Sequence, residues 1–373
     1  MRFPEFSGKW KKVRLGEECN MLCGYAFNGE DIVEQGSYLL MRGINITEGS
    51  IRHSSELDRY YSGSIEKLDK YKLAVGDLVI GMDGSKVGRN SAIVSSYEDG
   101  SYLVQRVCRI KSSIGNNYIL QFINNTKFHQ YVDTVKTSSA IPHISLRDIQ
   151  NYRISIPPTQ NETDKIAKLF LLIDERIATQ NKIIEDLKKL KSAISERLFK
   201  SVKGSTVLLS DLCDIVKGKQ INGENLSDSG NYYVMNGGTE PSGYYDNYNV
   251  EASTISISEG GNSCGYVQFN TSPFWSGGHC YSIQNIADKV DNMYLYHYLK
   301  SNEDAIMKLR IGSGLPNIQK KDLAMFKIIV PKIEWQIKIS TFLSSLERKA
   351  EIEERIQNVM QKKKLYLLQQ MFI

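Results

Sequence analysis

The sequence predicts an α+β fold in which two mixed α/β domains are separated by two long antiparallel coiled-coil helices and related by a pseudo-twofold internal repeat. Two observations predict this fold. The chain of 373 residues repeats its own pattern, and each copy ends in a long stretch without Gly or Pro that carries apolar residues at heptad spacing. The composition, 41% hydrophobic and 24% charged, is that of an ordinary globular protein, and the length exceeds what one hydrophobic core usually holds.

The repeat is visible at both ends of each copy. The segment that begins at Val13 recurs 194 positions later at Val207, and the same offset maps Cys19 onto Cys213. Further along, the segment 139–144 (SAIPHI) matches 313–318 (SGLPNI) at a shorter offset of 174. Similarity that keeps its order across a half-chain indicates a duplication. Because the offset shrinks, the middles of the copies are predicted to have diverged.

The repeat divides the chain into four parts. We expect a first domain at 1–157, a central long helix at 158–203, a second domain at 204–331 and a C-terminal long helix at 332–373. Short β-branched runs beside Gly-rich turns, such as 78–81 and 254–257, are typical of strands. The two domains are therefore expected to be mixed α/β globules with irregular connections.

The two helical parts carry the predicted contact between the copies. A helix of about 38 residues spans roughly 57 Å, because each residue adds about 1.5 Å. Such a helix gains most of its stability from packing, so each long helix is expected to pair with the other. The alternative is that each helix packs on its own globule. The apolar residues assigned to this helix and partner interface are Ile166, Phe170, Ile173, Ile177, Ile184, Leu187, Ile194, Leu198, Ile339, Leu343, Leu346, Ile356, Met360, Leu367 and Met371.

Composition and motifs exclude several classes of function. The net charge of +5 permits a nucleic-acid partner without requiring one. No apolar run approaches the ~18 residues that a membrane helix needs, and the N-terminus lacks the apolar core of a signal peptide, so a cytoplasmic protein is expected. The six cysteines form no C-x-x-C pair, and no metal site is predicted. The sequence contains neither a phosphate-binding loop nor a convincing catalytic constellation, and no catalytic residue is assigned.

Basic and small polar residues gather in loops at matched places of the two copies. Small residues let the backbone approach a phosphate, Lys and Arg neutralise it, and Asn, Gln and Arg can pair with base edges. An ordinary solvated loop is the alternative for each cluster. The candidate DNA-binding residues are Lys86, Arg89, Lys136, Thr137, Ser138, Ser139, His143, Arg147, Lys217, Lys219, Gln220, Asn262, Lys308, Arg310, Ser313, Asn317, Lys320 and Lys321.

Taken in order, these segments resemble the DNA-specificity subunit of type I restriction-modification systems over essentially the whole chain. The resemblance is carried by Trp10–Glu17 with its copy at Val207–Asp211, by Ala140–Ile144 with its copy at 314–318, and by Ile154–Pro158. The openings of both long helices are also similar to the family pattern, although Thr163 stands where the family usually has Gln.

The resemblance implies a non-catalytic recognition subunit. Each globule would be a target recognition domain that reads one half of a bipartite, asymmetric site on double-stranded DNA. The helices would dock two modification (methyltransferase) subunits, and a restriction subunit is a further candidate partner. S-adenosylmethionine and ATP with Mg would be bound by those partners, with no cofactor in this chain and no membrane contact. The main alternative is a tandem-repeat coiled-coil scaffold that does not bind DNA.

Overall fold

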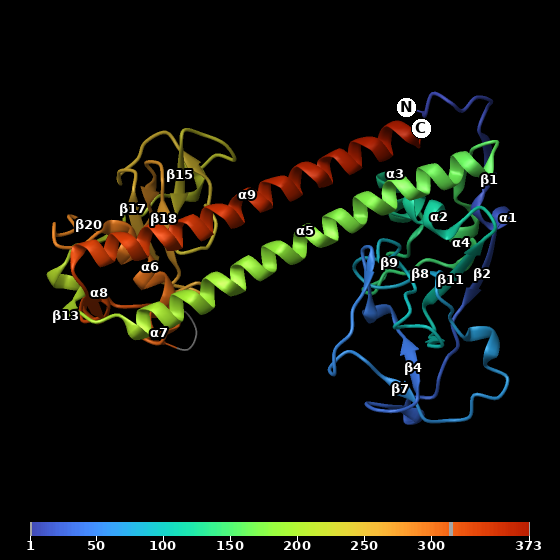
Figure 1. Ribbon diagram of the computed structural model, residues 1–373, viewed down its shortest axis with the longest axis horizontal. Helices are drawn as coiled ribbons and strands as arrows, with labels where there is room; N and C mark the ends of the chain where they lie inside the picture. Colours follow the sequence, from blue (N-terminus) through green and yellow to red (C-terminus); the bar gives the residue numbers. More distant parts are fainter. Residues whose placement is uncertain (1, 313–315, 373) are drawn as a thin grey trace. The chain divides into compact units, whose positions relative to one another are not determined.

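The computed structural model describes residues 2–312 and 316–372. The chain forms two compact units, unit 1 (Met1–Gln180 with Ile356–Ile373) and unit 2 (Asn181–Arg355). Figure 1 follows the chain through both units from the N-terminus to the C-terminus. The candidate Ser313 lies outside the described residues.

Unit 1 is built on an antiparallel four-stranded sheet of order β2-β11-β8-β9. Its strands are β2 (Cys19–Cys23), β11 (Val107–Ser112), β8 (Leu78–Gly81) and β9 (Ser91–Ile93). A second four-stranded sheet has the order β10-β4-β7-β3, from β10 (Tyr102–Leu103), β4 (Tyr38–Met41), β7 (Tyr60–Tyr61) and β3 (Ile32–Val33). Two short pairs complete the strands, β1 (Lys11–Arg14) with β12 (Arg153–Ile156) and β5 (Ile46–Thr47) with β6 (Ser50–Ile51).

Short helices cover the first sheet of unit 1. They are α1 (Leu15–Glu18), α2 (Asn116–Ile123), α3 (Thr126–Val135) and α4 (Leu146–Asn151), with 3-10 turns at Gly29–Asp31, Gly43–Asn45 and Asp69–Tyr71. α4 begins where the Ser145 side chain accepts from the N–H of Asp148 and the Asp148 carboxylate accepts from the N–H of Ser145, a reciprocal capping box. α2 is almost wholly buried, and Tyr118 and Phe122 bring its aromatic rings into the core.

Unit 2 repeats the first of these sheets. Its order β14-β20-β17-β18 comes from β14 (Asp214–Lys217), β20 (Cys280–Gln284), β17 (Thr254–Ser258) and β18 (Val267–Asn270). The smaller elements are β13 (Ser205–Leu208) paired with β21 (Lys327–Val330), and a sheet of β16 (Tyr244–Tyr245), β15 (Tyr232–Met235) and β19 (Trp275–Ser276). The helices are α6 (Asn292–Ser301), α7 (Glu303–Met307) and α8 (Lys320–Ala324), with 3-10 turns at Leu209–Asp211 and Gly223–Asn225.

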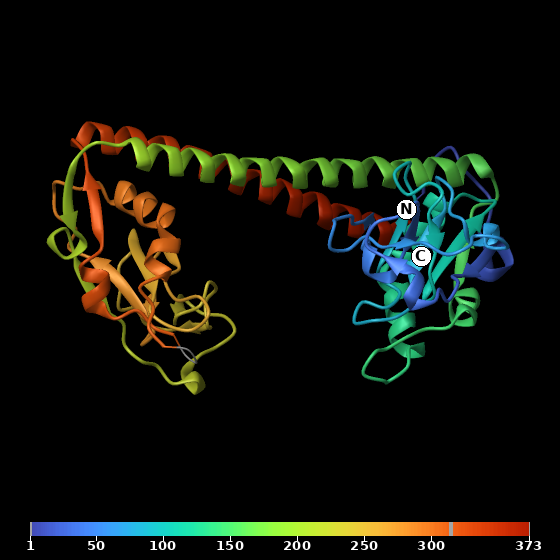
Figure 2. The same cartoon turned by 90° about the horizontal axis from the view of Figure 1, so that it is seen from below.

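Two long helices run without interruption, α5 (Gln160–Ser201) and α9 (Ile333–Met371) (Figure 1 and Figure 2). In unit 1, the rings of Phe170 and Phe372 are 5.7 Å apart, and Lys364 pairs with Asp174 at 2.5 Å. In unit 2, Lys188 pairs with Glu354 and Lys191 pairs with Glu347, each at 2.6 Å. The order of these contacts shows that the helix segments within each unit run in opposite directions.

The predicted seam residues differ in burial. Ile166, Phe170, Ile184, Ile339, Leu343 and Met371 are buried. Ile173, Ile177, Leu187, Ile194, Leu198, Leu346, Met360 and Leu367 are partly buried. Ile356 was also assigned to the seam, but its side chain is 39% exposed. It therefore does not pack between the helices and stays a candidate only for contact with a partner protein. In the part of the chain that the structure describes, no helix is both long and apolar enough to cross a membrane.

Candidate nucleic-acid interface

Two predicted loops meet beside the β2-β11-β8-β9 sheet of unit 1. The N–H of Gly84 donates to the carbonyl oxygen of Pro142 at 3.0 Å, and the N–H of Ile144 donates to the carbonyl oxygen of Met82 at 3.0 Å. Gly84 has φ +90°, a left-handed conformation in which Gly has no steric cost. The turn that carries Lys86 and the loop that carries His143 are therefore held together by main-chain bonds.

Unit 2 has the same arrangement at the corresponding positions. The N–H of Gly261 donates to Pro316 at 3.0 Å, and the N–H of Ile318 donates to the carbonyl oxygen of Glu259 at 2.8 Å. Gly261 has φ +76°, and Gly260 bridges to Asn317 as Asp83 bridges to His143. The predicted match between the two copies thus extends to individual main-chain hydrogen bonds.

A third and a fourth segment reach the same place in each unit. A Cβ atom on Gly43 would lie 3.5 Å from Oδ1 of Asp83, and one on Gly237 would lie 3.4 Å from the carbonyl oxygen of Gly260. The N–H of Met82 donates to Arg106, and the N–H of Glu259 donates to His279, both at 2.9 Å. We define turn site 1 as 82–89, 136–144, Gly43 and Arg106, and turn site 2 as 259–265, 310–312, 316–318, Gly237 and His279.

The predicted cations around turn site 1 are paired with acids on the surface. Lys86 Nζ lies 3.0 Å from Glu48 Oε1, Arg89 lies 3.0 Å from Asp133, and Lys136 lies 2.6 Å from the other oxygen of Asp133. The hydrogen bond from Lys136, with help from Arg89, lowers the pKa of the Asp133 carboxyl. Because exposed ion pairs are worth only about 0–1 kcal/mol, these cations can exchange their acid for a phosphate at small cost.

The small polar residues of this loop hold its shape. Thr137 Oγ1 accepts from the N–H of His143 and lies 3.0 Å from its Nδ1, and the Ser139 hydroxyl donates to the carbonyl oxygen of Ile141 at 2.7 Å. Ser138 is exposed on the loop, and Arg147 is exposed on α4. Thr137 and Ser139 therefore position the backbone, and Ser138 and Arg147 present their side chains to solvent.

Turn site 2 contains a buried carboxylate that the sequence did not single out. Glu259 is only 6% exposed, and its Oε1 accepts from Lys217 Nζ at 2.6 Å and from the Tyr281 hydroxyl at 3.2 Å. Its Oε2 lies 3.8 Å from Nδ1 of His279. Burial raises the pKa of Tyr281, with the negative charge of Glu259 adding to it. The candidate Lys217 therefore already holds a partner inside the protein.

The other candidates of unit 2 are mostly exposed. Asn262, Lys308, Arg310, Asn317, Lys320 and Lys321 present their side chains to solvent, as do Lys219 and Gln220. The bridge between Ile311 and Asn317 joins the segment that carries Arg310 to the other loop of turn site 2. Lys320 and Lys321 begin α8, and the carbonyl oxygen of Lys219 accepts from the Trp275 indole at 2.9 Å.

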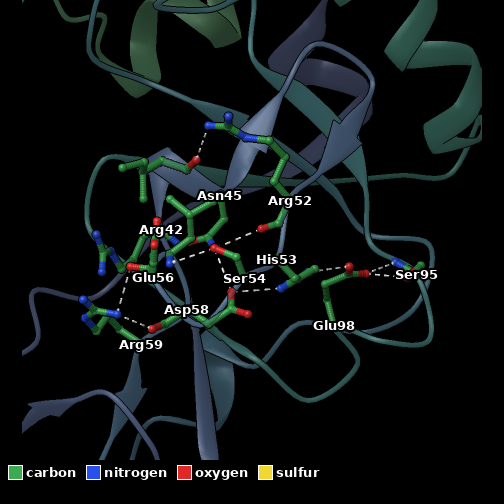
Figure 3. A network of polar contacts seen from close by, with 12 residues as sticks. Arg42, Asn45, Arg52, His53, Ser54, Glu56, Asp58, Arg59, Ser95 and Glu98 are labelled. Atoms are coloured by element: carbon green, nitrogen blue, oxygen red, sulfur yellow. Dashed lines mark hydrogen bonds and ion pairs between the residues drawn. The ribbon is translucent and has the colours of Figure 1, made fainter. Parts of the chain in front are cut away.

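A polar network that the sequence did not predict holds the segment 45–58, which follows β4 in unit 1 (Figure 3). His53 places Nδ1 3.0 Å from Asp58 and Nε2 2.9 Å from Glu98, and Asn45 donates to Asp58 at 3.1 Å. Burial would raise the pKa of Glu98, but hydrogen bonds from Ser95 and His53 outweigh burial and lower it. The network fixes the backbone between Gly43 of turn site 1 and the exposed Arg52.

Arg52 and Arg106 are exposed cations of unit 1 that the candidate set lacked. Arg52 donates to the carbonyl oxygen of Ile44 at 3.1 Å, next to Gly43 of turn site 1, and Arg106 belongs to turn site 1 itself. The 194-residue offset of the repeat also maps Met41 onto Met235 and Gly43 onto Gly237, which indicates that both copies contain this region.

The sequence profile of the type I restriction modification DNA specificity domain matches residues 7–189 and again residues 203–362. The chain belongs to this family. The profile matches the chain twice, once in each of the predicted copies. Among residues 2–312 and 316–372, no cluster of three or more His, Cys, Asp or Glu side chains is arranged to hold a metal ion.

Curated proteins that are similar to this chain are named as type I specificity subunits. The EcoAI specificity subunit of Escherichia coli is 30% identical over 179 residues, 47% of this chain and 29% of that protein. The MjaX specificity subunit of Methanocaldococcus jannaschii is 24% identical over 345 residues, 80% of this chain and 78% of that protein. Alignments with specificity subunits of Mycoplasma genitalium and Mycoplasma pneumoniae span only 31% and 38% of those proteins.

Solved structures of the type I family share the fold. The S subunit of a type I restriction-modification system from M. genitalium matches 100% of this chain and 97% of its own with a TM-score of 0.70 at 17% identity. A chain from a study of complex assembly and conformational transition of the type I R-M system matches 98% of both chains with a TM-score of 0.56 at 16% identity. The predicted family is therefore confirmed, and so is the mixed α/β character of the fold.

Proposed function

We propose that this chain is the specificity subunit of a type I restriction-modification complex and that each unit reads one half of a bipartite, asymmetric DNA site. The observation that carries the proposal is the pair of turn sites. Both are framed by the same main-chain hydrogen bonds, from Gly84 to Pro142 and from Gly261 to Pro316, and they carry different side chains. The same backbone arrangement with different side chains would allow the two units to recognise two different half-sites.

Charge and hydrogen-bonding capacity support DNA as the ligand of these sites. Lys86, Arg89 and Lys136 in unit 1, and Arg310, Lys320 and Lys321 in unit 2, would neutralise phosphates and fix the register of the protein on the duplex. Asn262 and Asn317 carry amide groups that can pair with an adenine in the major groove. The remaining candidates, including Lys217, Lys219, Gln220 and Lys308, are proposed as supporting contacts.

The long helices supply the second half of the proposed function. α5 and α9 would pair as an antiparallel coiled coil that sets the distance between the two recognition domains. Their outer faces leave apolar side chains in solvent, among them Leu172, which is 53% exposed, and Phe342, which is 46% exposed. These faces support docking of two methyltransferase subunits, and a restriction subunit is a further candidate partner of the same complex.

The chemistry of the proposed complex would belong to the partners. S-adenosylmethionine would be bound by the methyltransferase subunits, and ATP with Mg by the restriction subunit. The relatives are specificity subunits, which are the non-catalytic members of such systems. We expect the purified chain to transfer no methyl group to DNA when S-adenosylmethionine is supplied, and methyl transfer by this chain alone would contradict the assignment.

Exchange of one recognition domain tests the proposal directly. Residues 207–331 are replaced by the corresponding segment of another family member, and the complete complex is expressed with its methyltransferase subunits. Sequencing of methylated DNA should show one half of the target altered and the other half retained. The reciprocal exchange of residues 13–157 is the matched control and should alter only the other half. Changes in both halves after a single exchange would refute the division of labour.

A further inference from the structure

Three equivalent positions lie at the start of each turn site, one in the turn itself and two on the neighbouring strands. In unit 1, Cys23 of β2 pairs in register with Cys108 of β11, and in unit 2, Lys217 of β14 pairs in register with Tyr281 of β20. The third position is Met82 in unit 1 and Glu259 in unit 2, since each donates its N–H to the segment just before β11 or β20. The backbone around these three positions is therefore the same in both units, and each side chain of unit 1 can be compared with its counterpart in unit 2.

The two units fill these positions with different chemistry. In unit 2, Lys217 and Tyr281 both bond to the carboxylate of Glu259. In unit 1, all three side chains contain sulfur. Cys23 Sγ lies 3.7 Å from Met82 Sδ, and the Cys108 thiol donates to the carbonyl oxygen of Arg109 at 3.5 Å.

The strand geometry brings the two thiols within reach of a covalent bond. The N–H of Gly24 donates to the carbonyl oxygen of Val107 at 2.9 Å, which makes that neighbouring pair the hydrogen-bonded one. Pairs alternate along an antiparallel ladder, so Cys23 and Cys108 form a non-hydrogen-bonded pair, whose Cα atoms are typically about 4.5 Å apart. Disulfides usually join Cα atoms about 4.4–6.8 Å apart.

Exposure and charge make Cys23 the reactive partner. Cys23 is half-buried and Cys108 is fully buried. The hydrogen bond from Cys108 lowers the pKa of Cys23 to about 7, against the effect of burial and with help from the charge of Arg106. Burial raises the pKa of the thiols of Cys19 and Cys280 to about 11 and that of Cys213 to about 12, and it also raises the pKa of Cys264. A thiolate is the nucleophile in thiol oxidation, so Cys23 is expected to react first.

We propose that Cys23 and Cys108 form an oxidation site for peroxides in unit 1, and that unit 2 has no counterpart because Lys217 and Tyr281 occupy the equivalent positions. The Cys23 thiolate attacks one oxygen of hydrogen peroxide, the O–O bond breaks, and hydroxide leaves and is protonated to water. The resulting sulfenic acid is attacked by Cys108 sulfur, which forms the S–S bond and loses its proton as a second water leaves. Two thiols are oxidised to one disulfide, and one peroxide is reduced to two waters.

The oxidation site lies behind turn site 1. The carbonyl oxygen of Arg106, two residues before Cys108, accepts from the N–H of Met82, where the turn begins. A new S–S bond would draw Cys23 Sγ away from Met82 and change the support of the turn. If the proposed function holds, peroxide would therefore weaken recognition of the half-site read by unit 1 and leave the other half-site unaffected.

Peptide mass spectrometry of the full reduced chain tests the oxidation site without using DNA. The protein is treated with hydrogen peroxide, free thiols are blocked with N-ethylmaleimide, and the digest is searched for linked peptides. The expected result is a Cys23–Cys108 linked peptide that dithiothreitol removes, with the other four cysteines blocked. In Cys108→Ser, Cys23 should stop at the sulfenic acid and form an adduct with dimedone.

Two outcomes would overturn the proposal. One is full blocking of Cys23 and Cys108 after peroxide treatment that oxidises another cysteine of the chain. The other is irreversible oxidation of Cys23 in the wild-type protein without a cross-link. Cys19→Ser is the matched control because Cys19 also lies on β2, and its replacement should leave the cross-link unchanged. A cross-link that forms without changing DNA affinity would leave the oxidation site standing and count against the function assigned to turn site 1.

Discussion

The ring of Phe372 lies 4.5 Å from the ring of Phe122 inside the core of unit 1. At the matching position of the repeat, Phe199 packs 5.2 Å from Tyr298 inside the core of unit 2. α5 begins in unit 1 and ends in unit 2, and α9 does the reverse. Near the C-terminal end of each long helix, a phenylalanine therefore enters the core of the unit that the helix reaches.

Removal of either ring should destabilise one unit selectively. Phe372→Ala is expected to lower the free energy of unfolding of unit 1 by about 3–5 kcal/mol, because it deletes a buried aromatic side chain. Phe199→Ala should do the same to unit 2. Hydrogen exchange measured by mass spectrometry in mild denaturant will show which unit opens. Phe372→Leu keeps most of the apolar volume and should cost less, and equal opening of both units by Phe372→Ala would contradict the division described here.

Loss of the two lysines that begin α8 should weaken DNA binding at every sequence. In Lys320→Ala with Lys321→Ala, two exposed cations are removed, so fewer counterions are released on binding. Affinity should fall, and the slope of log affinity against log salt should become shallower by up to about 2. Gel-shift titrations at several salt concentrations measure both quantities. Lys362→Ala with Lys363→Ala on α9 removes the same charge and is the control, and equal slopes for the two double variants would remove Lys320 and Lys321 from the contact set.

The ion pair between Lys191 and Glu347 should stabilise unit 2 more than the neighbouring pair between Lys188 and Glu354 does. Glu347 Oε1 accepts from Lys191 Nζ at 2.6 Å and from the Tyr296 hydroxyl at 3.1 Å, and both side chains of the ion pair are mostly covered. Glu347→Gln should lower the free energy of unfolding of unit 2 by about 1–3 kcal/mol, since charged hydrogen bonds in covered positions are replaced by weaker ones. Urea denaturation measures the loss. Glu354→Gln breaks the more exposed pair with Lys188 and should cost less than about 1 kcal/mol. If both variants lowered the free energy of unfolding equally, burial of the side chains would not determine how strongly these ion pairs stabilise unit 2.

Acid should destabilise unit 2 through His297. Burial lowers the pKa of His297 to about 4, and Nε2 lies 2.9 Å from the Ser344 hydroxyl. The unfolded chain takes up this proton near the ordinary value of about 6.5, so the free energy of unfolding should fall as the pH drops from about 6.5 to 4. The full effect is on the order of 3 kcal/mol. Urea denaturation at a series of pH values measures it against His297→Gln, which should lack this part of the slope. Parallel curves for the two proteins would exclude His297 as the cause.

The sequence was sufficient for the elements that depend on periodicity and repetition. The heptad spacing predicted both long helices, and β-branched runs beside Gly-rich turns predicted the strands that became β8 and β17. The matched segments 140–144 and 314–318, each with a small residue, Pro and Ile at the same spacing, identified one of the loops in each turn site. Such features repeat along the chain, so they can be found without knowing which distant residues meet.

Contacts between distant segments were beyond that reasoning. The acids that pair with the predicted cations, such as Glu48 with Lys86, come from other parts of the chain. The register of Ile356 also could not be predicted, because polar residues on that part of α9 interrupt the heptad pattern. The equivalence of Cys23 with Lys217 is present in the 194-residue offset, but its meaning depends on Cys108 and Tyr281, which only the strand pairing supplies.

The two loops of each turn site are joined to one another by main-chain hydrogen bonds, and this has a consequence for how the protein can change over evolutionary time. The bonds from Gly84 to Pro142 and from Gly261 to Pro316 use no side-chain atom. Mutations at neighbouring solvent-facing positions can therefore accumulate without dismantling the scaffold. On the proposed function, a lineage could drift toward a new nucleotide preference in one half of its target while the other half is inherited intact.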